Sequence, residues 1–166
     1  MHSGPLALDT ARVLVTNDDG IHAPGLEVLE RIARSLSRDV WVVAPETEQS
    51  ATSHALTLRR PLRLRERAAQ RYSVDGTPTD CVLVAHQHLL RDHPPDIVLS
   101  GINHGANLGE DVHYSGTVAA ALEAALLGSR AVAFSQMRSG GEIAGWETAE
   151  RFAPVILERL AKLDWP

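Results

Sequence analysis

Several short apolar segments are each followed by side chains that carry carboxylate, hydroxyl or amide oxygens. These side chains are those of Asn17, Asp18, Asp19, Ser50, Asn103 and Asn107. Two adjacent carboxylates repel each other and are costly to remove from water together, so a buried placement of Asp18 and Asp19 calls for a cation beside them. Oxygen ligands without a cluster of His and Cys favour Mg²⁺, Mn²⁺ or Ca²⁺ over zinc. We therefore predict a site for one divalent ion.

A second group of residues suits an anion. Ser115, Gly116 and Thr117 stand at the start of an Ala-rich segment that is typical of a helix. The free N–H groups and the positive dipole end of a helix favour phosphate. Taken alone, each group has an ordinary explanation: the Asp pair fits a solvated turn, and the Ser-Gly-Thr sequence fits a simple helix cap. Together, a metal site and a phosphate site indicate phosphoryl chemistry.

A strand, a helix and a second strand can bring the Asp18–Asp19 pair close to Ser50. Residues 12–16 and 40–44 are short β-branched and apolar runs, and the segment from Pro24 to Leu36 has apolar residues at helical spacing. Such a βαβ unit makes a parallel pair with a right-handed crossover and places both following loops at the carboxyl edge of the sheet. We therefore expect Asp18 and Ser50 to be neighbours. Asn17 is expected to brace its loop through its amide.

Further segments extend this pattern. We predict a strand at 96–100 followed by a polar loop at 101–111, a helix at 77–90, a helix at 116–127 and a strand at 131–135. Leucines that alternate with polar residues in 55–75 predict strands with one solvent-exposed face. The final helix, 146–163, should contain a kink or a new start at Pro154 and should turn four apolar residues inward. These are Phe152, Val155, Ile156 and Leu160.

The predicted fold is an α/β protein with a doubly wound, mostly parallel sheet and helices on both faces, as in Rossmann-like proteins. Residues 1–11 are expected to be a flexible leader, and residues 12–166 a single catalytic domain. With 44% hydrophobic and 22% charged residues, the chain has the composition of a globular protein. Aromatic residues are only 4%, so the core should be aliphatic.

Charge and hydropathy limit the partners. A net charge of -5 lacks the basic field that duplex nucleic acid requires, so no stable nucleic-acid complex is expected. An alternating run of arginines fits a solvated strand face better than a polyphosphate or nucleic-acid site; it comprises Arg59, Arg60, Arg63, Arg65 and Arg67.

No apolar run reaches roughly 18 residues, which predicts no membrane span. The lone Cys81 cannot form an intramolecular disulfide, so a cytoplasmic location is expected.

Five segments, in order, resemble the successive motifs of the SurE family of stationary-phase survival proteins. They are VLVTNDDGIHAPG, VVAPETEQSATSHALT, VDGTPTDCV, VLSGINHGANLGEDVHYSGTVAAALE and AVAFSQ. The resemblance implies a SurE-type fold and a metal-dependent 5'-nucleotidase that converts a nucleoside 5'-monophosphate to nucleoside and phosphate. It implies metal ligands at Asp18, Asp19, Ser50 and Asn103. It also implies that Asn107 faces the phosphate together with Ser115, Gly116 and Thr117.

Some roles remain open at this stage. Asp19 could also orient or deprotonate the attacking water, so Asp18, Asp19 and Asn107 are the candidate catalytic residues. His104 is near the expected site and could shuttle a proton, although an ordinary loop histidine is the simpler interpretation. SurE proteins usually continue beyond the last helix seen here with an extension that builds subunit contacts. A homodimer or tetramer is expected if that extension is not essential.

Two alternatives to an active enzyme remain. The chain could be a non-catalytic nucleotide- or metal-binding protein that retained the pocket. It could instead be a truncated subunit that needs a partner. A metal-dependent release of phosphate would distinguish the enzyme from both, and Mg²⁺ and Mn²⁺ cannot be told apart by the ligand types.

Overall fold

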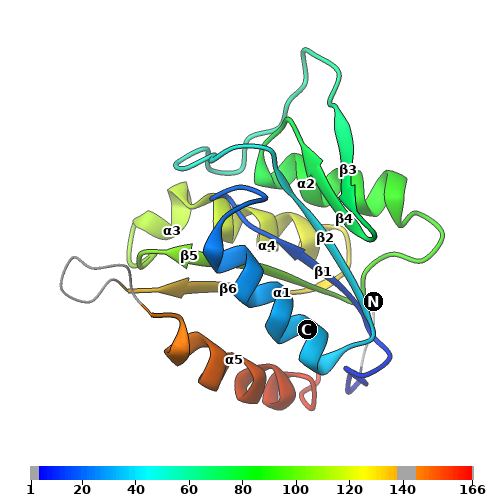
Figure 1. Cartoon of the computed structure of the whole chain (residues 1–166), viewed down its shortest axis with the longest axis vertical. Coiled ribbons are helices and arrows are strands. Elements are labelled where there is room, and N and C mark those ends of the chain that lie inside the picture. Colours follow the sequence, from blue (N-terminus) through cyan, green and yellow to red (C-terminus); the bar gives the residue numbers. More distant parts are fainter. Residues whose placement is uncertain (1–3, 138–144, 166) are drawn as a thin grey trace.

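The structure is a computed structural model of the chain and describes residues 4–137 and 145–165. Figure 1 shows a central sheet with helices around it. The elements in chain order are β1 (Arg12–Thr16), α1 (Pro24–Leu36), β2 (Asp39–Pro45), β3 (Leu64–Ala68), β4 (Arg71–Val74), α2 (Pro78–Val84), the π-helical turn η1 (Ala85–Leu89), β5 (Ile97–His104), α3 (Asp111–Tyr114), α4 (Gly116–Leu126), β6 (Arg130–Gln136) and α5 (Glu147–Leu160).

The sheet has the strand order β3-β4-β2-β1-β5-β6. Every neighbouring pair is parallel except β3 and β4, which form an antiparallel hairpin at one edge. The chain leaves β1 on one side to reach β2 and returns on the other side to β5. Strand order therefore reverses at β1, the kind of position at which open α/β sheets bind their ligands.

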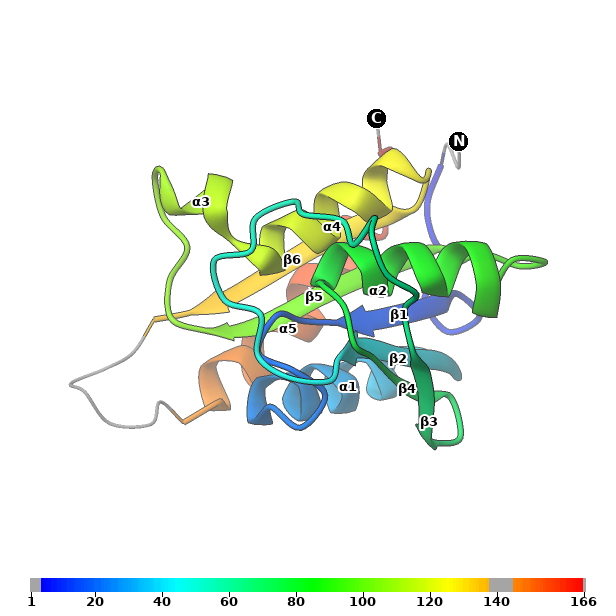
Figure 2. The ribbon, with the colours of Figure 1, turned by 90° about the horizontal axis from the view of Figure 1, so that it is seen from above.

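Helices cover both faces of the sheet, as predicted. Figure 2 shows α1 and α5 on one side and α2 and α4 on the other. Alternate residues of β1 divide between the two layers: Val13 and Val15 pack with α1, whereas Leu14 packs with α2 and α4. Both cores are built mainly from Ala, Val, Leu and Ile. Within the described residues, no helix is long and apolar enough to cross a membrane.

Residues 4–11, part of the expected leader, contact this core. The Leu6 N–H donates to the carbonyl of Ala161 at 2.7 Å. Leu6 and Leu8 pack against the layer of α1 and α5. The division into a leader and a domain beginning at residue 12 stays a prediction.

Two predictions about strands need correction. Residues 55–63 form no strand, because their backbone pairs with the cap of α2 instead: the Thr57 N–H donates to Asp80 at 3.0 Å and the Thr77 hydroxyl donates to the carbonyl of Ala55 at 2.7 Å. The strand expected to end at Ser100 continues to His104, because its last two residues pair with Ser135 and Gln136 of β6 after a register shift.

The inward face of the last helix was also predicted incorrectly. Phe152, Val155 and Ile156 are 50%, 44% and 45% exposed, whereas Ala153 and Leu157 are buried. Leu160, the fourth residue predicted to face inward, is partly buried. Helix α5 packs on α1 through the face that carries Ala153 and Leu157, so Phe152, Val155 and Ile156 remain outside the core. The helix runs without interruption through Pro154.

Candidate active site

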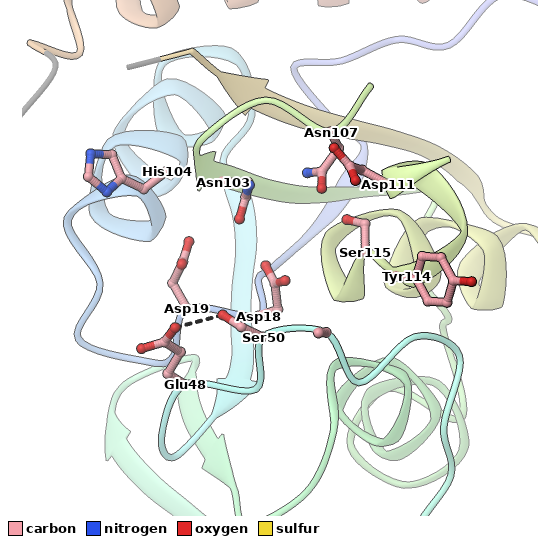
Figure 3. A pocket seen from close by; sticks show the side chains of 11 residues that line it. Asp18, Asp19, Glu48, Ser50, Asn103, His104, Asn107, Asp111, Tyr114 and Ser115 are labelled. Atoms are coloured by element: carbon pink, nitrogen blue, oxygen red, sulfur yellow. Dashed lines mark hydrogen bonds between the residues drawn. The ribbon is translucent and has the colours of Figure 1, made fainter. Parts of the chain in front are cut away.

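A cavity of about 420 Å³ opens at the carboxyl ends of β1, β2 and β5, beside the start of α4 (Figure 3). It contains all four predicted metal ligands. Its lining residues are Asp18, Asp19, Glu48, Ser50, Ala51, Asn103, His104, Asn107, Asp111, Tyr114 and Ser115. Side chains from positions up to 97 residues apart, Asp18 to Ser115, therefore share one hollow.

The turn after β1 aims the two adjacent carboxylates. Asn17 is fully buried, and its amide closes the turn on Gly20: the Gly20 N–H donates to Asn17 Oδ1 at 3.2 Å and Asn17 Nδ2 donates to the Gly20 carbonyl at 3.0 Å. Gly20 has φ +101°, in the region that favours glycine. The predicted bracing role of Asn17 is confirmed, and it leaves Asp18 and Asp19 at the cavity.

Asp18 is the most deeply placed carboxylate of the cavity, with only 5% of the residue exposed. The Thr117 hydroxyl donates to Asp18 Oδ1 at 2.5 Å. Burial raises the pKa of Asp18 above its ordinary value, although hydrogen bonds from Thr117 act in the opposite direction. A nearby dication would compensate for this cost, because it favours the ionised carboxylate.

The loop that carries Ser50 is held at both ends. The Gln49 N–H donates to the backbone carbonyl of Asp18 at 2.7 Å, which ties the loop to the end of β1. Further on, the Ser53 hydroxyl donates to the carbonyl of His113 at 2.8 Å. The Ser50 hydroxyl donates to Glu48 at 2.6 Å (Figure 3), so the lone pairs of its oxygen remain suited to a cation.

Asn103 and Asn107 reach the cavity from the end of β5 and the loop after it. Asn103 Nδ2 donates to the carbonyl of Gly105 at 2.9 Å. This bond turns the amide oxygen of Asn103 toward Asp18 and Asp19 (Figure 3). Asn107 Nδ2 donates to the Ser135 hydroxyl at 2.8 Å and can still offer a second N–H.

The residues at the start of α4 lie in two different surroundings, the cavity and the buried side of Asp18. Ser115 lines the cavity and caps the helix by accepting the Val118 N–H at 3.2 Å. Gly116 and Thr117 do not line the cavity. The Thr117 side chain is fully buried and its hydroxyl is bonded to Asp18. The phosphate role that the resemblance implied for Gly116 and Thr117 stays a prediction.

Sequence reasoning missed Glu48 and Asp111 and assigned no role to the side chain of Tyr114, all three of which line the cavity together with His104. The spacing offered one signal, since Glu48 lies two residues before Ser50 in the same polar segment. Asp111 and Tyr114 belong to α3, a single turn that no hydrophobic periodicity could reveal. None of the described residues that line the cavity is a lysine or arginine.

These donors fit a hard divalent cation. Two carboxylates, one hydroxyl and one amide oxygen come from the turn after β1, the loop after β2 and the end of β5. Oxygen-rich sets of this kind suit Mg²⁺ or Mn²⁺. In the part of the chain that the structure describes, no cluster of three or more His, Cys, Asp or Glu is suited to a metal. The candidate site therefore depends on Ser50 and Asn103 as well as on Asp18 and Asp19.

The fold and the cavity define a doubly wound α/β protein with an acidic, oxygen-lined site at the reversal point of its sheet. Comparison with known proteins gives a family. The family described as "Survival protein SurE" matches residues 13–165. The chain belongs to the SurE family.

Individual relatives agree with this assignment. A "5'-nucleotidase SurE" of Paramagnetospirillum magneticum is 61% identical over 154 residues, covering 93% of this chain and 59% of the relative. The same-named protein of Rhodospirillum rubrum is 59% identical over 161 residues, covering 95% and 61%. The crystal structure of the SurE protein from Aquifex aeolicus has a TM-score of 0.85 at 39% identity and covers 93% and 62%. The chain thus spans about three fifths of the length of these relatives.

Proposed function

We propose that this chain is a phosphatase that hydrolyses nucleoside 5'-monophosphates to nucleoside and phosphate with one Mg²⁺ or Mn²⁺ ion per chain. The observation that carries the proposal is the convergence of Asp18, Asp19, Ser50 and Asn103 on one cavity. The name "5'-nucleotidase SurE" of relatives 61% and 59% identical to this chain supports the choice of substrate. The cytoplasm is the proposed location, and a homodimer or tetramer the proposed assembly.

Asp18, Asp19, Ser50 and Asn103 would hold the ion. A bound dication would neutralise charge on a phosphoryl oxygen and orient a water for in-line attack. Asp18 is the fixed member of the set, because it is buried and held by Thr117. Asp19 is more exposed and is the candidate to orient or accept a proton from the water.

The charge of the cavity explains why a cation would be needed. Four carboxylates line the cavity, those of Asp18, Asp19, Glu48 and Asp111, and no lysine or arginine accompanies them among the described lining residues. A phosphate dianion would therefore be repelled in the absence of a metal. With the ion bound, the Asn107 amide and the Ser115 hydroxyl can donate to phosphate oxygens, and the N-terminus of α4 adds its dipole.

Phosphate release from AMP and GMP tests the proposal. We expect turnover with Mn²⁺ and none with EDTA. Asp18→Ala should lower the activity at least about 100-fold, because mutation of residues that only hydrogen-bond to a metal ligand already lowers metal affinity or activity about 10- to 100-fold. Asp92→Ala is the matched control, because Asp92 is exposed and lies outside this cavity. Turnover in EDTA, or full turnover in Asp18→Ala, would rule out the mechanism.

The same assay separates the two alternatives. A non-catalytic binding protein would bind nucleotide only with Mn²⁺ and release no phosphate. A subunit that needs a partner would release phosphate only after it is mixed with a longer SurE protein. Binding is measured by isothermal titration calorimetry on the same protein samples.

A further inference from the structure

The hydrogen bond between Thr117 and Asp18 joins two parts of the chain that are 99 positions apart. Thr117 lies in the first turn of α4 and Asp18 in the turn after β1. The donor and acceptor atoms are 2.5 Å apart, and the residues are 0% and 5% exposed. Hydrogen bonds to an ionised acceptor, shielded from water, are the strong ones.

The hydroxyl of Thr117 has only one proton to donate. Because that proton is given to Asp18 Oδ1, the hydroxyl cannot also donate to a phosphate in the cavity. Thr117 is also absent from the cavity lining, whereas its neighbour Ser115 is present. Its side chain therefore acts on Asp18 and not on the contents of the cavity.

Gly116 confines the same carboxylate from a second direction. A Cβ atom on Gly116 would lie 2.8 Å from Asp18 Cβ and 3.0 Å from Asp18 Oδ2. The first turn of α4 is thus pressed against the Asp18 side chain. With Gly116 on one side and the Thr117 hydroxyl on Oδ1, the carboxylate has little freedom to rotate.

We infer that Thr117 is a positioning residue that holds the carboxylate of Asp18 in the orientation required to bind the divalent ion. The inference rests on the proposed function, since it concerns the same ion. It assigns to Thr117 a role different from the phosphate contact that the family resemblance suggested. A partner that orients a ligating carboxylate commonly affects metal affinity by 10- to 100-fold.

Three variants test this role through Mn²⁺ affinity. Thr117→Val keeps the shape but removes the donor, Thr117→Ser keeps the donor, and Thr79→Val is the control. Thr79 is equally buried, and its hydroxyl has no hydrogen-bond partner in the described structure. Affinity is measured by calorimetric titration and by the electron paramagnetic resonance signal of free Mn²⁺, with circular dichroism melting to show that each variant is folded.

We expect Thr117→Val to bind Mn²⁺ at least about 10-fold more weakly than the unchanged protein. Thr117→Ser and Thr79→Val should bind within about two-fold of it. Unchanged affinity in Thr117→Val, or an equal loss in Thr79→Val, would overturn the positioning role. Absence of Mn²⁺ binding in the unchanged protein would instead overturn the proposed function, so the two failures are distinct.

Discussion

The substitution Asp18→Asn should separate two effects of this carboxylate: the free-energy cost of burying its charge and its contribution to metal binding. Burial raises the pKa of Asp18 above its ordinary 3.8, so the folded protein holds a proton there more tightly than the unfolded chain does. The stability this contributes is present below pH 3.8 and is lost as the pH rises through the folded pKa. At neutral pH without metal, Asp18→Asn should therefore melt at the same or a higher temperature, since Asn keeps an oxygen for the Thr117 hydroxyl.

A bound cation should reverse this comparison, so that the unchanged protein melts at a higher temperature than Asp18→Asn. Mn²⁺ at 100 times its dissociation constant stabilises a folded protein by about 2.7 kcal/mol. For a chain of this size, that corresponds to a rise in melting temperature of about 5–10 °C. The unchanged protein should show this rise, and Asp18→Asn should lose most of it.

Differential scanning fluorimetry in EDTA and in MnCl₂ measures both effects at about pH 7.5, where an ordinary carboxyl group is fully ionised. Asp92→Asn, which alters an exposed carboxylate outside the cavity, should keep the full Mn²⁺ shift. The reasoning would be refuted by an Asp18→Asn protein that melts several degrees lower in EDTA. An undiminished Mn²⁺ shift in that variant would refute it equally.

Three other perturbations follow from the geometry. His86 is buried with Nε2 2.9 Å from the Ser129 hydroxyl, and burial lowers its pKa below 6.5, so its contribution to stability is present above pH 6.5 and is lost as the pH falls. Urea unfolding at about pH 7.5 and 5.5 should show this loss, and His86→Gln should reduce it. Gly116→Ala should weaken Mn²⁺ binding at least about 10-fold in calorimetry, because its Cβ would lie 2.8 Å from Asp18 Cβ; unchanged affinity would contradict the close packing. Asn17→Ala should lower the free energy of unfolding in urea by about 1–3 kcal/mol, because it leaves the buried turn groups unpaired. A loss below about 0.5 kcal/mol would contradict that account.

The sheet could be predicted because parallel strands buried on both faces read as short apolar runs. The strand predicted at 12–16 has the observed bounds, and the one predicted at 40–44 is longer by one residue at each end. The crossover rule then placed Asp18 and Ser50 at one edge, and the cavity confirms that they are neighbours. These predictions succeeded because local pattern and topology favoured the same arrangement.

The incorrect predictions concern segments whose conformation or buried face is determined by tertiary contacts. Leu56 and Leu58 alternate with polar residues as in a strand, but the neighbouring backbone groups bond to the cap of α2. In α5, the apolar pattern is wide enough to bury either of two faces. The choice of Ala153 and Leu157 over Phe152 depends on how α1 meets the helix, which periodicity does not contain.

Ser115 and Thr117 show why residue types at a helix start do not by themselves assign roles. Both carry a hydroxyl in the same short sequence, and the family resemblance gave both to the phosphate. Successive helical residues point about 100° apart, so residues two positions apart face very different surroundings. Ser115 faces the cavity, whereas Thr117 faces the buried end of β1 and meets Asp18. Under the proposed function, the Ser115 hydroxyl would contact the substrate and the Thr117 hydroxyl would align Asp18 as a ligand of the ion. A Thr117→Ser protein that binds Mn²⁺ normally, beside a defective Thr117→Val protein, would demonstrate this division.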